Sequence, residues 1–84
     1  MSNKRKYNHL YEIPVEKLEL STEAIKQLKR TGITSIGDCI DFYIRGDDVL
    51  LPARPPFFTI MGGEVKNKLM TSGYWSFVED NLND

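Results

Sequence analysis

The sequence predicts an all-α domain, a small bundle of four to five short helices. Its 84 residues are enough for one domain with one core. Apolar residues recur at spacings of three and four in several short segments, and helix-capping residues or glycines bound these segments. Because each periodic segment is brief, we expect short helices that pack around a single core.

Residues 1–11 contain the basic run Lys4, Arg5 and Lys6 and have no helical or strand periodicity. A solvated tail and an arm that contacts phosphates both fit this composition. We predict a flexible basic arm over residues 1–11 and one helical domain over residues 12–84. Residues 14–18 should form a short turn before the first helix.

The first long helix is predicted from its two ends. Ser21 has the chemistry of an N-cap for a helix that starts at Thr22. The helix should continue to Thr31 and stop at Gly32, since glycine tolerates the left-handed conformation that ends many helices.

The second helix should begin at Ser35 and Asp38, whose spacing resembles a capping box, and should run to about Arg45. Its apolar face is formed by residues three and four apart: Ile36, Cys39, Ile40, Tyr43 and Ile44. We interpret Cys39 on this face as a small buried hydrophobe rather than a reactive thiol.

Residues 46–59 are predicted to be irregular because prolines at positions 52, 55 and 56 remove backbone donors. One helical turn over residues 48–51 is compatible with this pattern. The Pro-Pro-Phe-Phe run can pack on the core or face a partner protein. We favour core packing for the run in general, but Arg54, Phe57 and Phe58 are also our candidates for a partner contact, since rigid aromatic segments make good interface anchors.

The C-terminal part contains two further helical segments. The first should extend from Glu64 to Ser72 and stop at Gly73, with Val65, Leu69 and Met61 directed inward. Ser76 and Glu79 form a second candidate capping box for a short terminal helix. Nine residues are predicted to form the core: Leu20, Ile25, Leu28, Ile33, Ile36, Ile40, Val65, Leu69 and Trp75.

The composition argues against several classes of function. The formal net charge is −1, with seven Lys/Arg and four Glu in residues 1–37 and the acidic excess in residues 38–84, so a broad basic field for nucleic acid is absent. The single cysteine rules out an internal disulfide, and it has no Cys or His partner at metal-ligand spacing. No apolar run is long enough to span a bilayer and no signal-peptide pattern follows Met1, so we expect a cytoplasmic protein.

Catalytic chemistry is not indicated either. No nucleophile and base stand at a recognisable spacing, and no glycine-rich phosphate loop is present apart from the segment around Gly37. We therefore predict a protein that is not an enzyme and that uses no cofactor and no small-molecule substrate.

Residues 14–38 carry a family pattern. It consists of Pro14-Val15, the helix start Leu18-Glu19-Leu20-Ser21, the helix end Leu28-Lys29, and Gly32-Ile33-Thr34-Ser35-Ile36-Gly37-Asp38 at the opening of the next helix. The pattern resembles the C-terminal domain of the bacterial RNA polymerase alpha subunit over about 25 positions without a gap, and Glu64 to Gly73 fits that family's last helix. The resemblance implies a helix-hairpin-helix fold of the SAM-like kind and a role in bacterial or bacteriophage transcription.

The DNA-reading positions of that family are changed in this chain. Where the family has an Arg that enters the minor groove, this sequence has Glu23, and where it has an Asn, this sequence has Lys26. The family's Gly-Lys-Lys-Ser loop has no counterpart. The remaining candidates for DNA contact are Lys26, Lys29, Arg30, Gly37 and Lys66.

Two functions follow as hypotheses. The first is a module that acts in transcription through protein contacts, with RNA polymerase or a transcription regulator as partner and with Glu23, Arg54, Phe57 and Phe58 as candidate contacts. The second is a weakly specific DNA-binding domain that contacts phosphates through the hairpin. No membrane partner is expected.

Overall fold

The computed structural model describes residues 6–45 and 55–82, apart from the side chains of residues 55, 56 and 58. Within this part of the chain, it contains the short 3-10 helices η1 (Asn8–Glu12) and η2 (Val15–Leu18). Five α-helices follow: α1 (Thr22–Arg30), α2 (Ile36–Arg45), α3 (Pro55–Gly62), α4 (Glu64–Thr71) and α5 (Trp75–Leu82). The predicted all-α class is confirmed, since the described residues pair in extended conformation only at the isolated bridge Pro14–Ser35.

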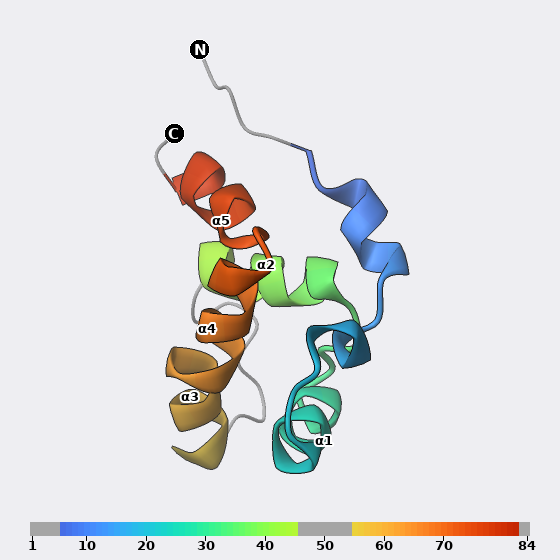
Figure 1. Ribbon diagram of the computed structural model, residues 1–84, viewed down its shortest axis with the longest axis vertical. Helices are drawn as coiled ribbons and strands as arrows, with labels where there is room; N and C mark the ends of the chain where they lie inside the picture. Colours follow the sequence, from blue (N-terminus) through green and yellow to red (C-terminus); the bar gives the residue numbers. More distant parts are fainter. Residues whose placement is uncertain (1–5, 46–54, 83–84) are drawn as a thin grey trace.

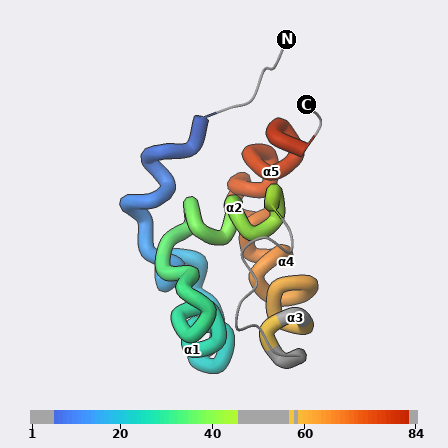
Figure 2. Tube along the Cα trace, turned by 180° about the vertical axis from the view of Figure 1, so that it is seen from behind, coloured from blue at the N-terminus to red at the C-terminus, as the bar shows by residue number. Residues whose placement is uncertain are grey.

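The helices form two sides joined by α2 (Figure 1). Helices α3, α4 and α5 follow one another as a column, and η1, η2 and α1 lie opposite. Helix α2 runs between the two sides, and the view from behind gives the same arrangement (Figure 2). No described helix has the length and apolar character needed to cross a bilayer.

Helix α1 begins at Thr22, as predicted, and ends at Arg30, one residue before the predicted Thr31. The Ser21 hydroxyl accepts a hydrogen bond from the Ala24 amide at 3.2 Å, which satisfies one of the unpaired donors of the first turn. At the other end, Gly32 has φ +90° and the Ile33 amide donates to the Leu28 carbonyl at 2.8 Å. This left-handed glycine turns the chain sharply toward α2.

Helix α2 begins with the predicted capping box. The Asp38 amide donates to the Ser35 hydroxyl at 3.1 Å, and the Ser35 amide donates to the Asp38 carboxylate at 3.2 Å. The helix then runs from Ile36 to Arg45, as predicted. Burial raises the pKa of Cys39 to about 12, with a smaller contribution from the nearby Asp38 charge, so at neutral pH the group is a buried neutral thiol.

The prediction of irregular structure up to residue 59 is wrong for its last five residues, because α3 begins at Pro55. Both prolines lie in the first turn, where the missing backbone donors would have no partner in the helix. The proline pair therefore starts a helix instead of preventing one. The predicted turn over residues 48–51 lies outside the described residues.

Two other boundaries differ from the prediction. Helix α5 starts at Trp75, so Ser76 is already inside the helix, and its hydroxyl donates to the Gly73 carbonyl at 3.2 Å rather than capping. Residues 8–11, assigned to the flexible arm, belong to η1, where Leu10 is 1% exposed. One buried leucine in a polar segment gives no periodicity, which explains why η1 was missed.

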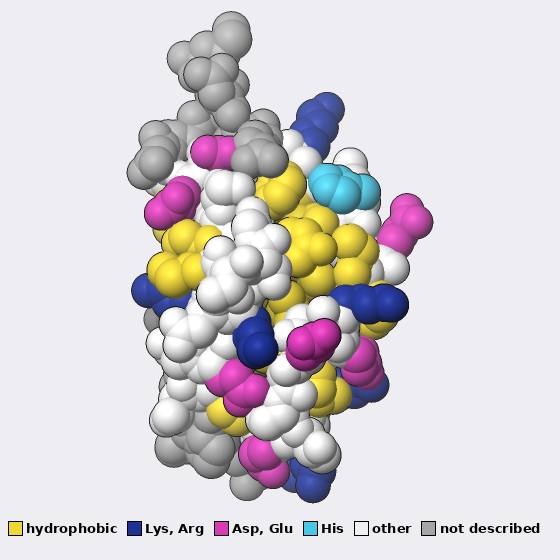
Figure 3. Space-filling view, in the orientation of Figure 1, with side chains coloured by type: hydrophobic (Ala, Val, Ile, Leu, Met, Phe, Trp, Pro, Cys, Tyr) yellow, Lys and Arg dark blue, Asp and Glu magenta, His cyan; other side chains and the backbone are white. Residues whose placement is uncertain are grey.

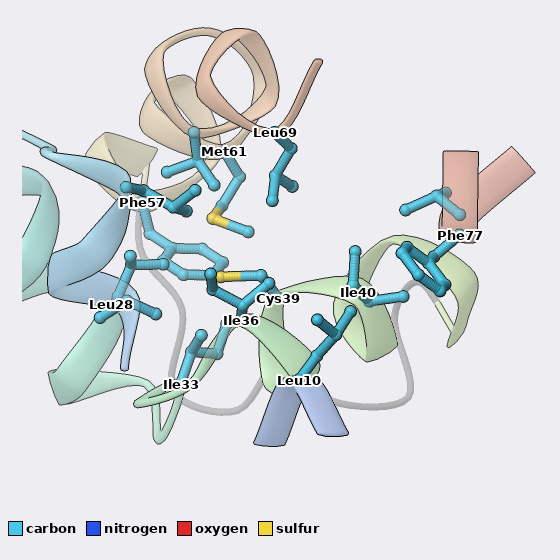
Figure 4. Close-up of a cluster of buried hydrophobic side chains, with 14 residues drawn as sticks. Leu10, Leu28, Ile33, Ile36, Cys39, Ile40, Phe57, Met61, Leu69 and Phe77 are labelled. Carbon is cyan, nitrogen blue, oxygen red and sulfur yellow. The ribbon is translucent and has the colours of Figure 1, made fainter. Parts of the chain in front are cut away.

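The core is one contiguous cluster (Figure 4). Six of the nine predicted core residues are buried, whereas Leu20, Ile25 and Trp75 are half-buried at its edge. Phe57 and Met61 from α3 complete the centre, with exposures of 0% and 2%. The short α3 helix thus supplies large side chains to the core of a small domain.

We predict that Leu28→Ala lowers the free energy of unfolding by about 2–5 kcal/mol, since Leu28 is fully buried and its truncation leaves a cavity. That loss is a large part of the stability of so small a domain. Urea unfolding measures it, with Met70→Ala as the control because Met70 is exposed. Equal, small changes in both variants would contradict the observed core.

Candidate interaction surface

The exposed face of α1 carries the charged residues that the sequence singled out. Glu23, Lys26, Lys29 and Arg30 are all exposed, while Ala24, Gln27 and Leu28 turn toward the interior. Gln27 is 7% exposed, and its side-chain amide donates to the Glu23 carboxylate at 2.7 Å. The Glu23 carboxylate is therefore held in place on the outer face of the first turn.

The basic residues of this face differ in their partners. Lys29 forms an ion pair with Glu16 of η2, and the hydrogen bond from Lys29 is the main cause that lowers the pKa of Glu16. Lys26 and Arg30 have no ionic partner among the described residues. Two cations thus remain available on a face that also carries the Glu23 carboxylate.

A carboxylate from α4 binds Ser21, the N-cap residue of α1. The Ser21 amide donates to one oxygen of Glu64 at 2.5 Å, and the Ser21 hydroxyl donates to the other oxygen at 2.9 Å. A negative charge at this position is favourable because the first turn of a helix presents unpaired amides and the positive end of the helix dipole. The contact also joins α1 to α4.

The N-terminus of α2 is filled in the same way. The amides of Thr34 and Ser35 both donate to one oxygen of Asp38, at 3.1 Å and 3.2 Å. The next amide, that of Ile36, donates to the Ile13 carbonyl at 2.8 Å. The amides of Thr34, Ser35 and Ile36 are thus committed to groups of this chain instead of a phosphate.

Gly37 is covered by an aromatic ring, so it does not present its backbone to solvent. A Cβ atom at Gly37 would lie 2.6 Å from Cδ1 of Tyr11, closer than any such contact allows. The absence of a side chain at Gly37 lets the Tyr11 ring pack closely against α2. The predicted phosphate contact at Gly37 is therefore not supported by the geometry.

Tyr11 is one half of a clasp on Asp41 of α2. The hydroxyls of Tyr7 and Tyr11 each donate to a different oxygen of the Asp41 carboxylate. Burial first, and then the hydrogen bond to Asp41, raises the pKa of both phenols, that of Tyr11 to about 12. The clasp holds η1 on α2.

The other predicted contacts lie elsewhere. The Lys66 ammonium is 5.1 Å from the centroid of the Trp75 ring, a cation–π arrangement that links α4 to α5. Phe57 is fully buried and its ring meets that of Phe42 edge-on at 5.4 Å, so its prediction as an exposed partner contact is wrong. Arg54 and the side chain of Phe58 lie outside the described residues.

Sequence reasoning missed the roles of Tyr7, Tyr11, Asp41 and Glu64. The pairs they form join residues 30 to 43 positions apart. From the sequence, Glu64 is only an acidic residue that suits the first turn of α4. No local pattern indicates that its carboxylate binds the N-cap of α1. The described residues contain no pocket and no group of three or more potential metal ligands.

Comparisons with protein-family models, with curated proteins and with solved structures found no match. The functional interpretation therefore depends on the geometry of α1 and of the two helix N-termini.

We predict that Gly37→Ala destabilises the domain even though alanine is the better helix former by about 1 kcal/mol. The new methyl group would displace the Tyr11 ring. In a Tyr11→Ala background the same change should become neutral or stabilising. Thermal unfolding of the four proteins in this cycle measures the effect, and stabilisation by Gly37→Ala in the parent would contradict the contact.

A second prediction concerns alkaline pH. In the folded protein the pKa of Tyr11 is raised from its ordinary value of 10.0 to about 12. The neutral Tyr11 phenol therefore contributes fully to the free energy of unfolding below pH 10, and this contribution is lost as pH rises through the folded-state pKa. Asp41→Asn should lower the pKa of Tyr7 and Tyr11, since it removes the charge that disfavours tyrosinate. Tyrosinate absorbance during a pH titration measures this, and an unchanged titration curve in Asp41→Asn would refute the clasp.

Proposed function

We propose that the chain is a non-enzymatic protein-interaction module that acts in bacterial or bacteriophage transcription. Its fold would be that of the RNA polymerase alpha C-terminal domain, with the α1–turn–α2 unit as the helix-hairpin-helix. Its partner would be RNA polymerase or a transcription regulator, bound through the exposed face of α1.

The local geometry of residues 14–38 supports the fold part of this proposal. A short capped helix ends at a left-handed glycine, and a second capped helix begins four residues later. The segments 13–18 and 31–36 are joined by two backbone hydrogen bonds, from the Val15 amide to the Thr34 carbonyl and from the Ile36 amide to the Ile13 carbonyl. This is the order of elements that the resemblance predicts.

The observation that carries the functional part is the occupancy of both helix N-termini by carboxylates. Glu64 binds Ser21 at α1, and Asp38 binds Thr34 and Ser35 at α2. Glu23 adds a further negative charge in the first turn of α1. A phosphate backbone would meet three carboxylates at these positions, which opposes DNA binding. A protein partner can instead pair with both signs of charge on α1.

One observation favours a second candidate, weakly specific DNA binding. Lys26 and Arg30 are exposed one helical turn apart and have no ionic partner among the described residues. Two phosphate contacts of this kind would give a low affinity with a modest salt dependence.

Charge reversal at Glu23 separates the two candidates. Glu23→Arg should reduce binding to the transcription partner by at least about tenfold and should raise affinity for A·T-rich duplex DNA, with a steeper salt dependence. Glu79→Arg is the matched control, because Glu79 is also exposed and the change in net charge is the same. The readouts are quantitative recovery of polymerase subunits and regulators from a bacterial lysate, and fluorescence anisotropy with labelled duplex.

Two results would overturn the proposal. One is recovery of the same transcription proteins by the parent and by Glu23→Arg, or of none by either. The other is tight, sequence-selective DNA binding by the parent protein, which would make the second candidate the function.

A further inference from the structure

Residues 6–12, here called the strap, are attached to the rest of the domain by side chains. The backbone hydrogen bonds described for this segment are local, such as the Leu10 amide to the Tyr7 carbonyl at 2.9 Å. The first backbone bond to another element is at Ile13, whose carbonyl accepts from Ile36. A segment held in this way can detach without breaking the backbone pairing of the helices.

Three side chains of the strap fit distinct features of α2. Tyr7 and Tyr11 donate to the two oxygens of Asp41, and the Tyr11 ring rests on Gly37. Between them, Leu10 is 1% exposed and points into the core beside α2 (Figure 4). The strap thus presents one aliphatic side chain, with a tyrosine three residues before it and another one residue after it.

The strap also contacts α5. The rings of Tyr7 and His9 lie 6.5 Å and 5.8 Å from that of Phe77, both in edge-on arrangement. Apolar side chains gather around the histidine on this face of the molecule (Figure 3). We call Gly37, Asp41 and Phe77, with the part of the core that Leu10 covers, the strap-binding face.

We propose that the strap is an intramolecular occupant of a docking site, and that the strap-binding face takes a partner protein's short helical segment with the same chemistry. That segment would carry an aliphatic residue flanked by tyrosines at positions −3 and +1. The strap would then regulate docking by competition. This inference is independent of the identity of the partner under the proposed function.

The chemistry of the face supports a specific occupant. Asp41 is half-buried and accepts hydrogen bonds from two phenols. A docked segment without hydroxyl groups would leave the Asp41 carboxylate without these two donors, which is unfavourable for a half-buried charge. Gly37 has room for the Tyr11 ring because it carries no side chain: a Cβ there would lie 2.6 Å from Cδ1 of that ring. A purely aliphatic helix therefore fits less well than a tyrosine-containing one.

Competition with the strap sets the apparent affinity. A segment tethered by a short linker has an effective concentration of about a millimolar, so it excludes a free ligand unless the strap is loosened. The apparent dissociation constant equals the intrinsic value divided by the fraction of molecules with an open strap. Weakening the strap without altering α2 should consequently tighten binding of a segment supplied in trans.

The test uses a synthetic peptide with the sequence of residues 6–13 and the full-length chain. Tyr7→Phe/Tyr11→Phe removes the hydroxyls from the strap and leaves the strap-binding face intact, so the labelled peptide should bind this variant at least about tenfold more tightly than it binds the parent. A peptide with both tyrosines replaced by phenylalanine should lose about tenfold or more. Tyr74→Phe is the control for loss of a phenol elsewhere and should behave as the parent.

A further variant and a hydrogen-exchange measurement test the proposal independently. Adding Gly37→Ala to the loosened variant should abolish peptide binding, because the methyl group fills the place of the Tyr11 ring. Hydrogen exchange should show residues 7–12 opening in the parent while α2 and α4 stay protected. Three results would each overturn the proposal. The first is that amide hydrogens of the strap exchange only through global unfolding, and the second is that the folded loosened variant binds no peptide. The third is that two copies of the chain swap their straps and no other binding occurs.

Discussion

The structure depends on how the unpaired amides at the starts of its helices are satisfied. Each helix begins with donors that have no partner inside the helix, and short helices have a large share of such donors. In α1 and α2 the partners are a hydroxyl and a carboxylate of the chain itself. At α1 the carboxylate comes from Glu64, so helix capping and the joining of α1 to α4 are one interaction.

This constraint also shapes the surface. A helix N-terminus is a ready anion site, and two of them lie in the α1–turn–α2 unit. Because Glu64 and Asp38 already fill them, the fold is stabilised by the same groups that oppose phosphates. What remains exposed on α1 is a mixed set of charges, with Glu23 held by Gln27 and Lys29 held by Glu16. Such a face suits a protein partner of complementary charge better than a uniform polyanion.

Local signals in the sequence predicted the fold class, the two caps at Ser21 and Ser35, and the stop at Gly32, because these depend on residues a few positions apart. Periodicity also predicted the buried residues Ile36, Ile40, Val65 and Leu69 of α2 and α4, whereas in α1 it was right for Leu28 and wrong for Ile25, which is half-buried. Residues 55–59 were misread because proline breaks a helix interior but suits a first turn. The hydrogen bonds from Tyr7 and Tyr11 to Asp41 and from Ser21 to Glu64 could not be predicted, because each joins residues at least 30 positions apart. Capping and periodicity signals extend over only a few neighbouring residues.

Glu64 and Asp38 occupy the amides of Ser21, Thr34 and Ser35, and we propose that they thereby keep phosphates away from the starts of α1 and α2. Amide NMR shifts of Ser21, Thr34 and Ser35, followed as a short DNA duplex is added at low salt, test it most directly. Small shifts confined to the Lys26 and Arg30 region, with these three amides unmoved, would agree with closure. Saturable shifts at the three amides would contradict it, since they would show that phosphates displace Glu64 and Asp38.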